Sequence, residues 1–237
     1  EGLDKPVIVT GSQIPLYEVR SDGKANLITA MMIAANYKIP EVCLCFGDKL
    51  LRGCRSVKVS ADRLHAFASP NYPSLGNIGI DIKINWDLIL PFPSTQFKVQ
   101  KLKQHAIGYL KFFPGISAVV MDNVLRTPLE GLILETYGVG NGPDKNKELI
   151  KVIENAVERG VVIVACTQSL HGTVNLREYA AGSALARAGL VSGYDMTGEA
   201  ALTKMLYLFS KELSVDEIRK MMQINLRGEL TPSLYGE

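Results

Sequence analysis

The 237-residue sequence predicts an α/β protein with two domains, and three observations support this fold class. The length exceeds the roughly 150 residues of a usual single domain. Short β-branched runs alternate along the chain with segments of helical periodicity. Residues 161–166 (VVIVAC) form a continuous apolar run, which is typical of a strand buried on both faces of a parallel sheet. This alternation predicts a doubly wound domain in the second half.

The first half of the sequence indicates the order strand, helix, strand, strand. The expected elements are residues 6–10, 24–36, 41–46 and a strand beginning at 49–51. Ser21, Asp22 and Gly23 provide the chemistry that starts a helix. Gly47-Asp48 is a dipeptide typical of a tight hairpin, so the last two strands are expected to pair in antiparallel fashion.

A boundary between domains is expected near the middle of the chain. Residues 69–79 are rich in Pro, Gly, Asn and Ser, which predicts a loop. Residues 81–103 show little helical period and predict an extended connection. The predicted division is the remainder of an N-terminal domain at 1–87, a linker at 88–103 and a C-terminal α/β domain at 104–237.

The second half alternates strands with helices. Strands are expected at residues 107–112, 131–136 and 161–166, and helices at 117–126, 145–159, 180–188 and 197–211. Ser214 and Glu217 have the spacing of a capping box, which predicts that a last helix begins there.

Composition and charge exclude several classes of function. Lys plus Arg is 26 against 24 for Asp plus Glu, and basic residues do not cluster with aromatic ones, so no nucleic-acid partner is expected. The longest apolar run is far shorter than the roughly 20 residues of a membrane span, so no membrane partner is expected. The four cysteines form no C-x-x-C pair and favour a reducing, cytoplasmic location. The three histidines lack metal-ligand spacing, so no metal is expected.

Two polar loops follow predicted strands, where α/β sheets place ligand contacts. The loop at 137–143 (YGVGNGP) is neither a dinucleotide fingerprint nor a Walker A motif, and a tight turn explains its glycines equally well. Thr167-Gln168-Ser169 favours backbone capping over ligand contact. For Lys58, by itself, a solvated basic surface is the ordinary interpretation. Composition and spacing therefore name no reaction.

Five segments resemble the cytosolic, type I bacterial-type L-asparaginases, in the order of that family and over nearly the whole chain. They are KPVIVTGSQIPLYEVRSDGKANLITA (5–30), LLRGCRSVKVSADRLHAFASPNYPSLG (50–76), FFPGIS (112–117), TYGVGNGP (136–143) and LRGELTP (226–232). The resemblance implies a truncated N-terminal parallel-sheet domain followed by a smaller, flavodoxin-like α/β C-terminal domain. It implies hydrolysis of L-asparagine to L-aspartate and ammonia, with no organic cofactor and no metal.

The family carries its nucleophilic threonine in a TGGT-type loop, and a second threonine with its aspartate in a GTDT-type loop. Neither motif occurs in this sequence. Because both belong upstream of the KPVIVTGSQ strand, we expect them to precede Glu1, and we expect the 237-residue chain alone to be inactive.

The resemblance also implies three site residues. Lys58 falls on the catalytic lysine of the family and would handle a proton during attack. Ser12 falls on the loop whose backbone approaches the substrate amide. Asn141 falls on a residue that reaches the active site of a neighbouring subunit, which implies a homodimer or homotetramer.

The sequence departs from the family members that asparagine activates at a second site. Those enzymes have a threonine, an arginine and a cysteine where this chain has Val57, Glu135 and Ser169. A glutamate would repel the carboxylate of the effector, so we expect no activation by asparagine. Two alternatives stay open: the amidase-like subunit of a tRNA-dependent amidotransferase, and a non-catalytic oligomerising α/β module.

Overall fold

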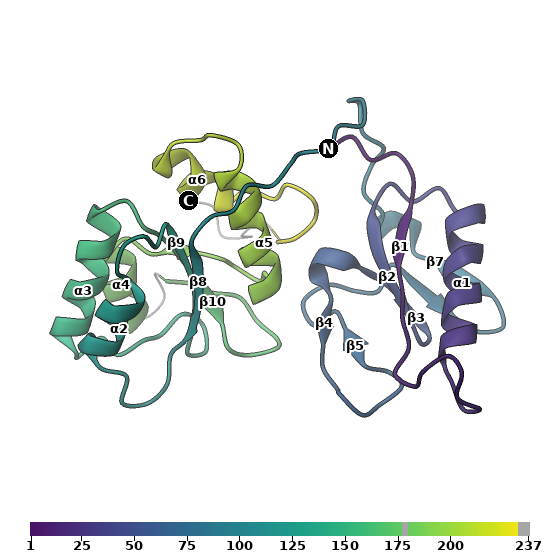
Figure 1. Ribbon diagram of the computed structural model, residues 1–237, viewed down its shortest axis with the longest axis horizontal. Helices are drawn as coiled ribbons and strands as arrows, with labels where there is room; N and C mark the ends of the chain where they lie inside the picture. The colour runs from purple at the N-terminus through teal and green to yellow at the C-terminus, as the bar shows by residue number, and fades with distance from the viewer. Residues whose placement is uncertain (177–179, 232–237) are drawn as a thin grey trace. The chain divides into compact units, whose positions relative to one another are not determined.

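The computed structural model describes residues 1–176 and 180–231. The chain divides into two compact units, Glu1–Gln100 and Lys101–Glu237 (Figure 1). Pro232, the last residue of the fifth segment that resembles the asparaginases, lies outside the described residues. The finer division into 1–87, 88–103 and 104–237 stays a prediction.

The first unit contains a five-stranded sheet. Its strands run in the order β1 (Val7–Val9), β2 (Val42–Phe46), β3 (Lys49–Arg52), β6 (Gly76–Ile78) and β7 (Ile82–Ile84). Strands β1 and β2 pair in parallel and are joined by helix α1 (Gly23–Asn36), whereas the other neighbours pair in antiparallel fashion. The parallel pair needs a crossover, which α1 supplies, and short turns suffice elsewhere.

The predicted hairpin is confirmed, since Phe46 pairs with Lys49 and Gly47 takes a φ of 59° in the turn between them. The prediction of a loop at 69–79 is wrong where the chain forms strand β6. The prediction of an extended connection at 81–103 is wrong where the chain forms strand β7 and the 3-10 helix Trp86–Leu88. Strands of three residues are too short to show a period. They form because each finds an antiparallel neighbour in the sheet.

The two faces of this five-stranded sheet pack against different elements. Helix α1 packs through Ile33 on a core that includes Cys43, Cys45 and Leu50. Burial raises the pKa of the Cys43 thiol to about 12 and that of Cys45 to about 11, so both behave as small packing residues. The other face is covered in part by Phe67, whose ring centroid lies 5.0 Å from that of Phe46.

Phe67 belongs to a second, very small sheet in the same unit. After the 3-10 helix η1 (Gly53–Arg55), strand β4 (Val57–Lys58) pairs in antiparallel fashion with β5 (Phe67–Ala68). The pairing places Lys58 opposite Phe67. This ribbon of two strands, labelled in Figure 1, positions the predicted catalytic lysine.

The second unit is a parallel four-stranded sheet between two layers of helices (Figure 1). Its strands run in the order β11 (Val191–Ser192), β10 (Val162–Thr167), β9 (Gly131–Thr136) and β8 (Ile107–Lys111). One face packs on α2 (Ala118–Val124), α3 (Lys147–Glu158) and α4 (Ala180–Arg187), and the other on α5 (Gly198–Phe209) and α6 (Val215–Met222). The prediction of a doubly wound α/β domain is confirmed.

Strand β10 shows why its sequence is a continuous apolar run. Ile163 and Ala165 face the layer of α3, whereas Val162, Val164 and Cys166 face the layer of α5, and all five are fully buried. A strand covered on both sides has no solvated face for polar residues. The predicted capping box is also present, with Ser214 and Glu217 satisfying each other's backbone amides at the start of α6.

Candidate functional site

In the first unit, the loop that follows β1 is held by the carboxylate of Asp22. Its oxygens accept hydrogen bonds from the backbone amides of Gln13 at 3.1 Å and Ile14 at 3.0 Å. Burial by itself would raise the pKa of Asp22, but these amides stabilise the charged form and the net effect lowers it. Ser12 is therefore part of a loop whose backbone is fixed on one side by an ionised carboxylate.

Asn26 of α1 holds the other side of the same loop. Its side-chain amide donates to the carbonyl of Gly11 at 2.9 Å and accepts from the backbone amide of Gly47 at 3.1 Å. Asn26 is buried, and these bonds satisfy its polar atoms while joining the loop to the turn between β2 and β3.

Lys58 lies beside this loop. Its ammonium donates a hydrogen bond to the side-chain oxygen of Gln13 at 3.0 Å and lies 5.8 Å from the centroid of the Phe67 ring. The amide nitrogen of Gln13 in turn donates to the carbonyl of Arg63 at 3.1 Å. The structure thus brings together Lys58 and the loop of Ser12, which lie 46 positions apart in the sequence. Lys58 is solvent-exposed.

Sequence reasoning missed the roles of Asp22 and Gln13. Asp22 stands at the N-cap position of α1 but forms no capping bond with its side chain, and the hydroxyl of Ser21 accepts from Gly23 instead. The signal at Ser21-Asp22-Gly23 predicts a helix start, which is confirmed. It does not reveal that the carboxylate turns back to amides eight and nine residues earlier.

In the second unit, Asn141 is part of a loop that folds back on itself. The backbones of Tyr137 and Asn141 exchange two hydrogen bonds of 2.8 Å, while Gly138 and Gly140 take φ angles of 49° and 120°. These left-handed angles explain two of the three glycines by the turn itself. Within residues 1–176 and 180–231, the side-chain amide of Asn141 forms no hydrogen bond.

Neighbouring polar groups support that loop. Thr167 donates its hydroxyl hydrogen to the carbonyl of Gly138 at 2.6 Å and accepts from the amide of Ser169, so the predicted capping role is confirmed. Gln168 donates to the carbonyl of Phe112 at 2.7 Å. These bonds anchor the carboxyl ends of β9 and β10.

Glu135 lies on β9 and is half-buried, with two exposed side chains of β8 as partners. The hydroxyl of Tyr109 donates to its carboxylate at 2.7 Å, and the ammonium of Lys111 lies 3.9 Å away. Burial, and then Glu135, raises the pKa of the Tyr109 phenol, so Tyr109 acts as a neutral donor. Glu135 thus has partners of its own from β8.

Among the described residues, no three His, Cys, Asp or Glu side chains are placed to hold a metal ion. The four cysteines are free thiols. No helix in that part of the chain is long and apolar enough to cross a membrane.

Comparison with known proteins decides the family. The family model described as "Asparaginase, N-terminal" matches residues 1–90, and that described as "Glutaminase/Asparaginase C-terminal domain" matches residues 106–222. L-asparaginase 1 of Escherichia coli strain K12 is 51% identical over 232 residues, which are 98% of this chain and 68% of that protein. The chain belongs to the asparaginase family. The family prediction is confirmed.

Solved structures and other relatives agree with this membership. The crystal structure of L-asparaginase I from Vibrio cholerae is similar to this asparaginase chain, with 51% identity and a TM-score of 0.91. The alignment covers 98% of this chain and 70% of the Vibrio cholerae chain. The human 60 kDa lysophospholipase is 44% identical, with 40% of its length covered. A glutamyl-tRNA(Gln) amidotransferase subunit of Methanobrevibacter smithii is more distant, at 30% identity with 52% covered. The predicted two-domain α/β fold is confirmed.

Proposed function

We propose that the intact protein is an L-asparaginase, which hydrolyses L-asparagine to L-aspartate and ammonia. The observation that carries this conclusion is the 51% identity to L-asparaginase 1 of Escherichia coli over 98% of the chain. The amidotransferase subunit is the second candidate, but its identity of 30% makes it the more distant relative.

The reaction proceeds in two steps because a carboxamide is a poor electrophile. A threonine hydroxyl attacks the side-chain carbonyl carbon of asparagine and gives up its proton. The carbon–nitrogen bond then breaks and the nitrogen leaves as ammonia, which leaves an aspartyl ester on the threonine. Water attacks the ester carbon, aspartate is released and the threonine hydroxyl is restored. The TGGT-type and GTDT-type motifs that hold the threonines in the family are not among these 237 residues.

Lys58 is proposed to handle a proton in these steps. Its position on β4, beside the loop that follows β1, supports this role, because Gln13 holds the ammonium at one point of that loop. Ser12 is proposed to present its backbone to the substrate amide, and the bonds of Asp22 and Asn26 to neighbouring residues support a rigid loop there.

Asn141 is proposed to reach the active site of a neighbouring subunit in a homodimer or homotetramer. The tightly folded loop supports this proposal, as does the side-chain amide of Asn141, which has no hydrogen-bond partner within the part of the chain that the structure describes. A cytoplasmic location is proposed as well, because the four cysteines are free and none is paired in a disulfide.

Ammonia release from L-asparagine by the purified intact protein tests the function, with L-glutamine as a second substrate. Lys58→Met should keep the fold and lose most of the turnover, because it removes the ammonium while keeping a long side chain. Lys58→Arg should not restore it, since a guanidinium does not release a proton near neutral pH.

Lys83→Met is the matched control, because Lys83 is also an exposed lysine on a strand, but on β7. It should leave turnover unchanged. Wild-type rates in Lys58→Met would show that Lys58 is only a surface charge, and absence of ammonia release from the intact protein would contradict the function itself.

A further inference from the structure

The strand that carries Lys58 has little core of its own. Strands β4 and β5 contain two residues each, and isolated two-stranded ribbons are marginally stable in water. On β5, Phe67 packs on Phe46, but on β4 Val57 is only half-buried and Lys58 is exposed. The position of β4 therefore depends on what holds the two ends of the ribbon.

One aromatic ring joins those two ends. Tyr72 lies in the segment that follows β5, whereas Arg52 and Arg55 come just before β4. The guanidinium carbon of Arg52 lies 4.5 Å from the centroid of the Tyr72 ring, and that of Arg55 lies 5.2 Å away. Both arginines are buried, where attraction between a cation and a π face is strongest. The ring thus joins the segment that precedes β4 to the segment that follows β5.

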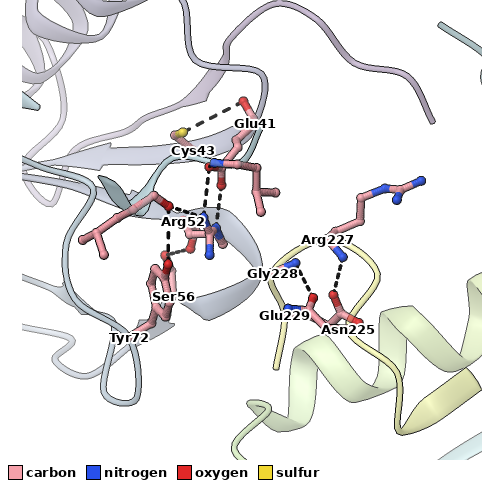
Figure 2. Close-up of polar contacts among 11 residues, drawn as sticks. Glu41, Cys43, Arg52, Ser56, Tyr72, Asn225, Arg227, Gly228 and Glu229 are labelled. Atoms are coloured by element: carbon pink, nitrogen blue, oxygen red, sulfur yellow. Dashed lines mark hydrogen bonds and ion pairs between the residues drawn. The ribbon is translucent and has the colours of Figure 1, made fainter. Parts of the chain in front are cut away.

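Arg52 is itself fixed by a bidentate ion pair (Figure 2). Its Nε donates to Glu41 Oε2 at 2.5 Å and its Nη2 to Glu41 Oε1 at 3.0 Å. Arg52 and Glu41 are 2% and 4% exposed. Separating the two buried charges would leave each of them unpaired, which is energetically costly. The planar bidentate contact therefore fixes the orientation of the Arg52 guanidinium.

The same groups also join the ring to the 3-10 helix Trp86–Leu88, which follows β7 in the chain. Arg52 Nη2 and the hydroxyl of Tyr72 both donate to the carbonyl of Leu88, at 2.8 and 3.3 Å. The hydroxyl of Ser56, the residue before β4, donates to the carbonyl of Arg52 at 2.7 Å. Figure 2 shows Arg52, Ser56 and Tyr72 in this arrangement.

We propose that Arg52, Arg55 and Tyr72 form a clamp, anchored by Glu41, that positions Lys58 for proton transfer. These residues are positioning residues, because they act on the reaction only through the placement of β4. The inference rests on the proposed role of Lys58. A purely structural role is the competing explanation, and it predicts a change in stability without a change in the turnover of the folded protein.

The test uses Tyr72→Leu in the intact protein, with Tyr72→Phe as the conservative control. Tyr72→Phe keeps the ring under both guanidinium groups and should keep kcat within about twofold. Tyr72→Leu removes the ring, and the displacement of Lys58 should lower kcat by roughly tenfold or more, with little change in KM for asparagine. Thermal unfolding of each variant establishes that kcat refers to folded protein.

A double variant separates action through Lys58 from a general effect. In the Lys58→Met background, Tyr72→Leu should bring no further loss of the residual kcat, measured at high enzyme concentration, because nothing remains for the clamp to position. A loss as large as in the wild-type background would overturn the proposal. An unchanged kcat in folded Tyr72→Leu would also overturn the proposal of a clamp. The proposed function would survive that result if Lys58→Met is inactive.

If Tyr72→Leu does not fold, Arg52→Lys makes the same comparison, since it keeps the charge and loses the planar bidentate contact. Arg52→Lys should lower kcat when it is introduced into the wild type, and it should not lower the residual kcat when it is introduced into Lys58→Met. Full turnover by Lys58→Met would refute the proposed role of Lys58, and this inference with it.

Discussion

A buried ion pair in the second unit allows a sharp test of what holds the C-terminal segment. The ammonium of Lys204, on α5, forms an ion pair with Glu229 at 2.6 Å and donates hydrogen bonds to the carbonyls of Met222 at 3.0 Å and Ile224 at 2.6 Å. The side chains of Lys204 and Glu229 are 4% and 6% exposed. We predict that Lys204→Met strongly destabilises the protein.

The magnitude follows from the burial of both charges. Removing one partner of a buried pair leaves the other charge uncompensated, which costs about 3–5 kcal/mol. Glu229 keeps hydrogen bonds from the backbone amides of Leu226 and Arg227, which favours the lower end of that range (Figure 2 shows the latter bond). A loss of this size is a large part of the roughly 5–15 kcal/mol that stabilises a typical protein.

Urea unfolding of the intact protein, followed by circular dichroism, measures this loss. Lys103→Met is the matched control, because Lys103 and Glu212 form an equally short contact of 2.7 Å but are 58% and 80% exposed. Water screens that pair, so its removal should change stability little. Adding Glu229→Gln to Lys204→Met should restore part of the loss, because no buried charge is then left unpaired. If Lys204→Met destabilises no more than Lys103→Met, the reasoning from burial is wrong.

Three further predictions concern pH, the isolated chain and kinetics. Burial would raise the pKa of Glu229, but Lys204 and the backbone amides lower it from its ordinary value of 4.5. Ionised Glu229 therefore contributes fully to the free energy of unfolding above pH 4.5, and this contribution is lost as the pH falls through the lower pKa of the folded protein. The unfolding free energies of the wild type and of Lys204→Met should therefore converge in acid. The 237-residue chain, purified from a host without asparaginase, should release no ammonia from asparagine, and robust activity would contradict the assignment. The intact enzyme should show hyperbolic dependence on asparagine because Glu135 repels an effector carboxylate, and a Hill coefficient clearly above one that Ser169→Ala abolishes would contradict this.

Elements whose signal lies within a few residues could be predicted from the sequence. The buried strand at 162–167 follows from an apolar run, the turn at Gly47 from a two-residue motif and the start of α6 from Ser214 and Glu217. The resemblance to the asparaginases pointed to Lys58, Ser12 and Asn141 by their place in motifs, and their roles stay predictions.

Other features of the protein were decided only by tertiary structure. The strands β6 and β7 are too short to carry a period, and they exist because neighbouring strands satisfy their backbone groups. The sequence shows 26 basic and 24 acidic residues but not which of them meet in the interior. That Arg52 pairs with Glu41, that Lys204 pairs with Glu229 and that Gln13 meets Lys58 depends on distant segments folding together, because the energy of a charge or an amide is set by its burial and its partners rather than by its neighbours in sequence.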